Sequence, residues 1–349
     1  MAVSVLPESV AIVVLGPSGL GLARRIKALL PGAAIHAPAA RRIDADLVFG
    51  KATDHLAALF AAGTPIVALC ASGIVVRALA PLLAAKREEP AVVAVAEDGS
   101  AAVPLLGGHR GANALARAIA AMTGGVAAIT TAGDLRFDLA LDEPPPGWRV
   151  ANPECAKPVM AALLAGEPVS LTVEAGDAAW LEASGARFAQ SATARIRITD
   201  RAASADEQAL VLHPPVLALG VGCERGIAAE EMHALVTETL RRNGLAAGAV
   251  ALIASLDLKS AEPAVHALAQ ALDVPARFFS AHELLAETPR LQTPSEAVLR
   301  AVGCYGVAEG AALAAAGPDA TLLVPKPAEG RVTCAVARAP AALDPPKIG

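Results

Sequence analysis

Hydrophobic residues occur in the first third of the chain as short blocks, separated by longer stretches with helical spacing. The blocks are rich in Val, Ile, Leu and Ala, and they cover residues 10–15, 46–49, 66–70, 91–96 and 126–130. Short apolar runs of this kind are typical of buried strands. The stretches between them predict helices, over 20–30 and from about Asp54, Gly73 and Ala112. Strands that alternate with helices indicate a mostly parallel sheet with helices on both faces.

The same alternation returns in the last third of the chain. Strands are expected at 216–221, 250–254, 276–279, 320–325 and 332–337. Helices are expected at 228–242, 262–272 and 295–301. This pattern predicts a second α/β module of the same general kind.

A shorter segment of different character lies between these modules. It contains an expected helix at 158–165, a strand at 169–173 and alternating residues at 192–199, which indicate a small α+β module. The proline-rich runs 142–147 and 213–215 mark its edges, because proline disrupts helices and central strands. We therefore expect two Rossmann-like three-layer α/β modules flanking a small α+β module, in domains 1–140, 141–215 and 216–340, with a tail at 341–349.

Composition narrows the class of protein. The 349 residues are 54% hydrophobic and carry a net charge of −5 without a basic block, which argues against nucleic-acid binding. The mean hydropathy of +0.50 raises the question of a membrane span, but the long uncharged run 56–76 is broken at 63–65 and at 72–73, as in a buried α/β segment. The N-terminus lacks a basic signal region, and five scattered cysteines suit reduced thiols, so we expect a cytoplasmic protein.

Several familiar motifs are nearly but not fully present. Residues 16–21 follow a strand with the wrong glycine spacing for a dinucleotide site and without the lysine of a P-loop. Residues 282–286 begin like a zinc-protease helix but lack the second histidine, so we interpret them as the start of a surface helix. The hypothesis of a nucleotide-dependent oxidoreductase is therefore supported only by the alternation of strands and helices, and a fold does not specify a function.

Four clusters of glycines and polar residues follow expected strands, at positions that line the ligand crevice of open α/β sheets. They are Ser72, Gly73 and Arg77; Gly107, Gly108, His109 and Asn113, with Thr131 nearby; Gly222, Glu224, Arg225 and Gly226; and Asp257 with Lys259. Helix N-termini hold anions, glycines admit a ligand to the backbone, and histidine titrates near neutral pH. A helix cap, a tight turn or a solvated charge is the alternative interpretation of each cluster.

Taken together, seven ordered motifs resemble one protein family. They read CASGIVVRALAPLL (70–83), LLGGHRGAN (105–113), ITTAGD (129–134), LGVGCERG (219–226), SLDLKSAEP (255–263), PSEAVLRAVGCYGVAEGAAL (294–313) and VPKPAEGRVTCAVAR (324–338). Their order and spacing are similar to those of the CbiG-type cobalt-precorrin-5A hydrolases of cobalamin (vitamin B12) biosynthesis. Residues 152–169 resemble the central segment of that family. The family pattern often has a second lysine shortly after the one at Lys326, and here Pro327, Ala328 and Glu329 follow instead.

The resemblance implies the chemistry. The substrate would be a ring-contracted cobalt tetrapyrrole in which one acetate arm forms a lactone with the extruded carbon. Water opens the lactone, and that carbon leaves as acetaldehyde, which gives cobalt-precorrin-5B. The reaction needs anion pockets, an activated water and stabilisation of the lactone oxyanion. Cobalt arrives with the substrate, so no cofactor and no protein-held metal are expected.

The resemblance supports these motifs, and the assignment of roles to individual residues within them is our hypothesis. His109 is the first candidate for the catalytic acid or base, followed by Glu224, Asp257 and Glu309. Because the net charge is negative, a polyanion must be bound locally, by Arg77, Arg225, Lys259, Lys326 and backbone N–H groups. The full set of expected substrate-binding residues is Ser72, Gly73, Arg77, Gly107, Gly108, Asn113, Thr131, Gly222, Arg225, Gly226, Lys259, Glu309 and Lys326. We further expect the turns of the first and last modules to form one shared cleft.

A second interpretation comes from the last module alone. Residues 216–340 resemble CobE, an accessory protein of the oxygen-dependent cobalamin route, so the chain could instead be a tetrapyrrole-binding protein without hydrolase activity. The N-terminal module with LLGGHRGAN favours the enzyme. A homodimer and association with other cobalamin-pathway enzymes are compatible with either interpretation, whereas no nucleic-acid or membrane partner is expected.

Overall fold

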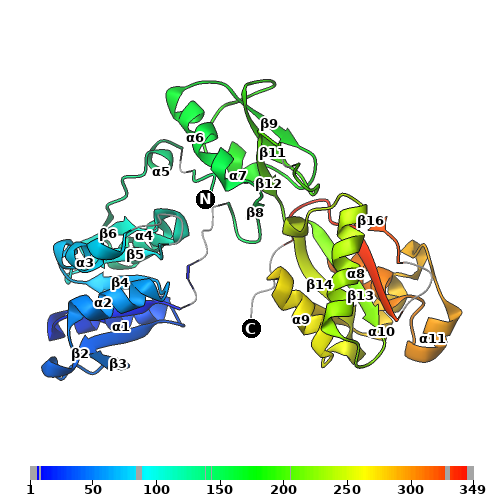
Figure 1. The fold of residues 1–349 in the computed structure, drawn as a ribbon, viewed down its shortest axis with the longest axis horizontal. Helices are drawn as coiled ribbons and strands as arrows, with labels where there is room; N and C mark the ends of the chain where they lie inside the picture. Colours follow the sequence, from blue (N-terminus) through cyan, green and yellow to red (C-terminus); the bar gives the residue numbers. More distant parts are fainter. Residues whose placement is uncertain are drawn as a thin grey trace. The chain divides into compact units, whose positions relative to one another are not determined.

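The computed structural model describes residues 6–7, 9–83, 89–137, 139–142, 144–204, 206–326 and 331–343. The chain divides into two compact units, Met1–Pro145 and Pro146–Gly349. Figure 1 shows an α/β sheet in the first unit and two sheets in the second. Residues 344–349 of the expected tail and 327–329 after Lys326 lie outside the described residues.

The first unit is built on a seven-stranded sheet in the order β3-β2-β1-β4-β5-β6-β7. Its strands are β1 (Ala11–Val14), β2 (Ala34–Pro38), β3 (Leu47–Phe49), β4 (Ile66–Leu69), β5 (Val92–Val95), β6 (Ala101–Leu106) and β7 (Val126–Ala127). The strands from β3 to β5 are parallel to one another, whereas β6 runs antiparallel to β5 and parallel to β7. The order reverses between β1 and β4, the position at which open α/β sheets form a ligand crevice.

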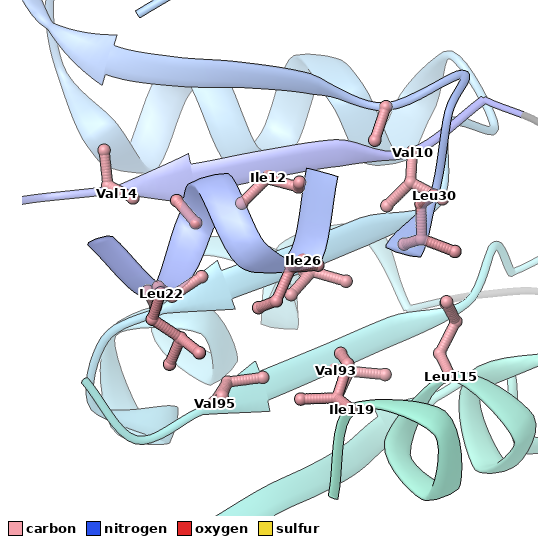
Figure 2. Close-up of a cluster of buried hydrophobic side chains, with 14 of the residues drawn as sticks. Val10, Ile12, Val14, Leu22, Ile26, Leu30, Val93, Val95, Leu115 and Ile119 are labelled. Carbon is pink, nitrogen blue, oxygen red and sulfur yellow. The ribbon is translucent and has the colours of Figure 1, made fainter. Parts of the chain in front are cut away.

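Helices cover both faces of this sheet. The helices are α1 (Leu20–Leu29), α2 (Ala52–Ala61), α3 (Ser72–Leu79), α4 (Ala112–Thr123) and α5 (Ala132–Phe137). Figure 2 shows Leu22 and Ile26 of α1 and Ile119 of α4 packed with Ile12 and Val93 on one face. Side chains of α2 and α3 pack with alternate strand residues on the other face. The unit is therefore a three-layer α/β structure, because each strand residue alternates between two apolar cores.

The second unit begins with a small five-stranded sheet in the order β10-β9-β11-β12-β8. Its strands are β8 (Arg149–Val150), β9 (Val169–Val173), β10 (Phe188–Ala189), β11 (Ala194–Ile198) and β12 (Leu210–His213), and its helices are α6 (Ala156–Ala165) and α7 (Ala179–Glu182). Four of the strands are parallel, and β8 pairs antiparallel with β12. The expected helix at 158–165 and strand at 169–173 are confirmed.

The second sheet of this unit has the order β15-β14-β13-β17-β16. Its strands are β13 (Leu217–Cys223), β14 (Val250–Leu256), β15 (Ala276–Phe279), β16 (Thr321–Val324) and β17 (Val332–Arg338). Its helices are α8 (Ala229–Arg242), α9 (Pro263–Leu272), α10 (Ala281–Ala286), α11 (Glu296–Val302) and α12 (Val307–Ala316). The apolar residues of α8 and α9 cover one face, and α12 with α10 covers the other. This part is also a three-layer α/β structure.

Helix α12 lies against the middle of this sheet through a single glycine. A Cβ atom at Gly220 of β13 would lie 1.8 Å from the carbonyl oxygen of Ala308 and 2.7 Å from the amide nitrogen of Ala312. Only glycine leaves room for the two backbones to approach so closely. The α12 helix is apolar on nearly all sides and was not expected from the sequence, because a helix buried all round shows no amphipathic pattern.

Ion pairs and hydrogen bonds join the two sheets of the second unit. Asp200, which is buried, is paired with Arg338 of β17 at 3.3 Å. The Arg149 guanidinium donates to the carbonyl oxygens of Leu272 and Asp273 at 2.9 and 2.8 Å. These contacts explain why the small sheet and the following α/β sheet form one compact unit.

Most expected elements are confirmed to within a few residues, but five strands were missed, namely β2, β6, β8, β10 and β12. Strand β2 contains proline, β6 lies next to a glycine-rich turn, and β12 precedes two further prolines. Strands β8 and β10 have only two residues each, too few to show a pattern. The expectation of a mostly parallel sheet needs a correction at β6, β16 and β17, which take part in antiparallel pairs. The hydrophobic pattern of a segment identifies it as a strand but does not show whether it runs parallel or antiparallel to its neighbours.

In the described part of the chain, no single helix is long and apolar enough to cross a membrane. Helices α11 and α12 together meet that test by length and composition only, with a bend of 79° between them. All five cysteines are free.

Candidate functional site

The carboxyl ends of the parallel strands in the last sheet carry the first candidate site, here called the C-terminal edge. Strands β13 and β14 end at Cys223 and Leu256, and the first residue of β17, Val332, pairs with Cys223. Residues 224–226, 257–262 and 331 therefore lie along one edge, and β16 leads toward it from the other side of β17. The third and fourth clusters expected from the sequence are thus brought together by the fold.

The turn after β13 is held from both sides. The backbone N–H of Glu224 donates to the carbonyl oxygen of Arg331 at 2.9 Å, and the Glu224 carboxylate pairs with the Arg331 guanidinium at 3.0 Å. Arg225 is exposed beside this pair. Gly226 has a φ of 71°, a left-handed conformation that glycine adopts without strain. This geometry leaves the Arg225 side chain available to a ligand.

A buried carboxylate joins this turn to the next one. Glu262 is 7% exposed, and its Oε1 accepts a hydrogen bond from the backbone N–H of Gly226 at 3.1 Å. Its Oε2 lies 3.9 Å from the ammonium of Lys259. Burial raises the pKa of the Cys223 thiol, with Lys259 acting in the opposite direction and Glu262 in the same one. Cys223 is therefore a neutral thiol beside the pair, without the lowered pKa of a nucleophilic cysteine.

Asp257 and Lys326 complete this edge. Asp257 is exposed directly after β14, and among the described residues no side chain donates a hydrogen bond to its carboxylate. Lys326 follows β16, is half-buried and donates its backbone N–H to Glu309 at 3.1 Å. Arg225, Lys259 and Lys326 thus supply positive charge from three different turns of one sheet.

Glu309 has a different position from the one expected of a ligand-binding residue. It is 1% exposed in the first turn of α12. Its carboxylate accepts from the backbone N–H groups of Gln292 (2.8 Å) and Thr293 (3.0 Å), from the Thr293 hydroxyl (2.6 Å) and from Lys326. Because the protein's own donors occupy both oxygens, we assign Glu309 to fixing these loops and not to contacting substrate.

The second candidate site is a cavity of about 440 Å³ in the first unit, at the reversal of strand order between β1 and β4. Its walls are mainly apolar. Its polar lining groups are Cys70, Ser72 and Glu97. The Ser18 hydroxyl donates to Glu97 Oε2 at 2.7 Å, and burial together with the Glu97 charge raises the pKa of Cys70 to about 11. The sequence pointed to Ser72 here but not to Glu97, which becomes part of the site only through the pairing of β4 with β5.

Arg77 is exposed on α3 and does not line this cavity. Its guanidinium donates to the carbonyl oxygen of Gly73 at 2.9 Å, so its charge lies next to the first turn of the helix that begins with Ser72. The predicted combination of a helix N-terminus with an arginine is therefore present as a local arrangement.

The cluster around residues 107–113 lies at the opposite edge of the sheet from Ser72. Strand β6 runs antiparallel to β5, and its last residue, Leu106, pairs with the first residue of β5. A Cβ atom at Gly107 would lie 2.4 Å from the carbonyl oxygen of Pro90, just before β5. The expectation that this cluster and Ser72 share one crevice is wrong, since a reversed strand carries its carboxyl end to the other edge.

The opposite edge nevertheless collects the remaining candidates of the first unit. Asn113 is 3% exposed at the start of α4, and its amide donates to the Thr131 hydroxyl at 3.0 Å. Gly108 and His109 lie in the short 3-10 turn before α4, between two glycines with positive φ. Gly107, Gly108, Asn113 and Thr131 are thus neighbours as expected.

Within the described ranges, no group of three or more His, Cys, Asp or Glu side chains is placed to hold a metal ion. The same part of the chain offers cations, backbone N–H groups and exposed carboxylates. Such a set can bind anionic side arms and move protons.

Three family models match consecutive parts of the chain. They are Cobalamin synthesis G N-terminal at residues 54–134, Cobalamin biosynthesis central region at 145–214 and Cobalamin synthesis G C-terminus at 217–337. The second and third sheets fall, to within one residue, inside the ranges of the central and C-terminal models, whereas the N-terminal model covers the first sheet only from α2 onward and leaves out β1, β2 and β3.

Individual relatives make the family more specific. The chain is 30% identical to the cobalt-precorrin-5A hydrolase of Priestia megaterium over 82% of its own length and 81% of the relative. It is 30% identical to the cobalt-precorrin-5A hydrolase of Salmonella typhimurium over 80% and 84%. The chain belongs to the cobalt-precorrin-5A hydrolase (CbiG) family.

Part of the chain also resembles a second protein. Residues covering 35% of this chain are 50% identical to Protein CobE of Sinorhizobium sp, over 79% of that protein. Among solved structures, CobE matches 35% of this chain and 89% of its own with a TM-score of 0.34 and 40% identity. A cobalamin biosynthesis protein G homologue from Sulfolobus solfataricus matches 95% and 98% with a TM-score of 0.36 and 23% identity.

Proposed function

We propose that this protein is a cobalt-precorrin-5A hydrolase of cobalamin biosynthesis. It opens the δ-lactone of the ring-contracted cobalt tetrapyrrole and releases acetaldehyde to give cobalt-precorrin-5B. One observation carries the proposal: two proteins named for this activity match about four fifths of the chain and of their own lengths.

The C-terminal edge suits the charge of such a substrate. The macrocycle carries many acetate and propionate arms, and a protein with a net charge of −5 must bind them through local cations. Arg225, Lys259 and Lys326 supply these cations at one edge. Charge-assisted hydrogen bonds to carboxylates are stronger than neutral ones, so each contact contributes to orientation as well as affinity.

The reaction has two chemical parts. Water adds to the lactone carbonyl, and the bond between the carbonyl carbon and the ring oxygen breaks. The products are a carboxylate and an alcohol. The alcohol then loses its O–H proton, its carbon–carbon bond to the macrocycle breaks, and the electron pair remains with the macrocycle as acetaldehyde leaves. Both parts need a base, and the first also needs donors for the oxyanion.

Three residues are our candidates for this base. Asp257 is exposed at the C-terminal edge and accepts no side-chain hydrogen bond from the described residues, whereas Glu224 is already paired with Arg331. His109 lies in the glycine-bounded turn of the first unit. We therefore place Asp257 before Glu224 among the carboxylates and keep His109 as the imidazole candidate.

Incubation of the protein with purified cobalt-precorrin-5A tests the proposal. We expect acetaldehyde and a pigment whose mass corresponds to addition of water and loss of that aldehyde. Removal of the true base lowers turnover by about 100-fold or more, so Asp257→Asn and His109→Ala are assayed in parallel. A variant with near wild-type turnover loses its proposed role, and unchanged pigment with the wild-type protein contradicts the proposal as a whole.

The 50% identity of the last part of the chain to Protein CobE supports a second candidate function. In that case the protein would bind the tetrapyrrole as an accessory protein without opening the lactone. The match of the N-terminal family model at residues 54–134 favours the hydrolase. Tight binding of cobalt-precorrin-5A without acetaldehyde release would support the accessory role.

A further inference from the structure

The buried side chain of Glu262 contacts both Lys259 and the Gly226 turn. Among the described residues, its carboxylate has no other hydrogen-bond or ion-pair partner. Glu262 stands immediately before α9, with Pro263 at the first helical position. Its carboxylate is 7% exposed and contacts the Gly226 N–H at 3.1 Å and the Lys259 ammonium at 3.9 Å. A carboxylate that only entered a helix would remain in solvent, as that of Glu296 does at the start of α11.

The backbone of residues 257–262 is folded so that Glu262 can contact Lys259. Residues 257–259 make a 3-10 turn, and the backbone N–H of Glu262 donates to the carbonyl oxygen of Lys259 at 3.0 Å. The Lys259 side chain is 19% exposed, so most of its length is covered and its ammonium stays near the edge. The lysine side chain has several rotatable bonds, and attraction to the buried Glu262 carboxylate restricts it to one conformation.

We infer that Glu262 is a positioning residue that holds Lys259 and the Gly226 turn in the arrangement that receives a carboxylate arm of the tetrapyrrole. This inference rests on the proposed function and adds a residue to it. Glu262 does not touch the substrate. It acts through Lys259, because a buried carboxylate 3.9 Å from the lysine holds the ammonium in place by charge attraction.

The test compares the variants Glu262→Gln and Lys259→Met alone and together, with cobalt-precorrin-5A as substrate. Glutamine keeps an acceptor for the Gly226 N–H but removes the negative charge beside Lys259. We expect E262Q to raise KM about tenfold, the size of a lost charge-assisted contact, with a smaller change in kcat. In the K259M background, E262Q is expected to change KM no further.

Glu296→Gln is the matched control, because it makes the same substitution at an exposed helix start and should leave KM unchanged. If E262Q raises KM equally with and without Lys259, Glu262 has a general structural role and the inference is overturned. If E262Q alone does not fold, K259M is compared with K259M/E262Q, in which the glutamine still accepts from the Gly226 N–H and no unpaired charge is buried. Equal KM values support the inference, and different values overturn it. Failure of the wild-type protein to release acetaldehyde would instead contradict the proposed function.

Discussion

Single residues decide how closely the layers of the second unit can pack. Gly220 is the clearest case, because the backbone of α12 occupies the space in which any other residue would place its Cβ atom. A core packed to the density of an organic crystal does not absorb an added methyl group without displacement.

Substitution of Gly220 with Ala is therefore expected to lower the free energy of unfolding by about 3 kcal/mol, since α12 must move off the sheet. The control is Gly21→Ala on α1, where an added Cβ meets nothing within 4 Å and where alanine should stabilise the helix by up to ~1 kcal/mol. Urea unfolding of both variants checks this. Equal midpoints for G220A and the wild type would show that the close approach is not needed.

Glu309 gives a second prediction for a single residue. Glu309→Gln replaces one acceptor oxygen with an NH₂ group, so two of the buried donors around it lose their partner. We expect the free energy of unfolding to fall by about 2 kcal/mol or more. Glu230→Gln, at an exposed position in the first turn of α8, is the control. Unchanged stability with a raised KM would return Glu309 to the substrate-binding residues.

At the level of elements, a histidine pair joins β2 to α2 in the first unit. Nδ1 of His36 lies 2.8 Å from Nε2 of His55, and the ring of Phe49 on β3 stacks on His55 at 4.5 Å. Asp46 faces His36 and is itself paired with Lys27 of α1 at 2.6 Å. One N–H can bridge two neutral rings, whereas two protonated rings would repel each other.

This pair makes the first unit less stable in acid. Burial lowers the pKa of both His36 and His55 below the ordinary value of 6.5. The unfolded chain therefore binds more protons than the folded one below that pH, and stability falls as the pH drops through about 6.5. Thermal unfolding at pH 7.5 and 5.5 measures this loss.

The matched variants are His55→Gln, which removes one titrating ring, and His233→Gln, at an exposed position on α8. H55Q should show a smaller pH dependence of the melting temperature than the wild type, and H233Q should show the same dependence. Acid sensitivity that is identical in all three proteins would assign it to other groups, such as the buried His213.

At the level of the whole molecule, each unit contains its own apolar cores. A segment with its own core is expected to fold independently. Fragments 1–145 and 146–349 should therefore each give a cooperative melt by circular dichroism. Neither should release acetaldehyde alone if the turns of the first and last modules form one cleft.

The same experiment tests that shared cleft, which stays a prediction. Lactone hydrolysis by fragment 146–349 alone would contradict it, and would place the whole reaction at the C-terminal edge. Restored activity on mixing the two fragments would support it.

Much of this protein is determined locally by its sequence. Apolar blocks and glycine turns predicted most strands and helices, and chain order placed residues 224–226 and 257–259 at one edge, because consecutive parallel strands end on the same side. The motifs likewise indicated the family before any geometry was known.

The tertiary structure alone decided the rest. The antiparallel direction of β6 moved residues 107–113 away from Ser72, since strand direction depends on distant pairing. Glu97, Glu262 and Glu309 have their roles through contacts with other segments, such as Ser18, the Gly226 turn and the loop at 292–293. The local sequence pattern predicts which residues are buried and where turns form. The partner of a buried charge lies in a distant segment and is determined only by the tertiary fold.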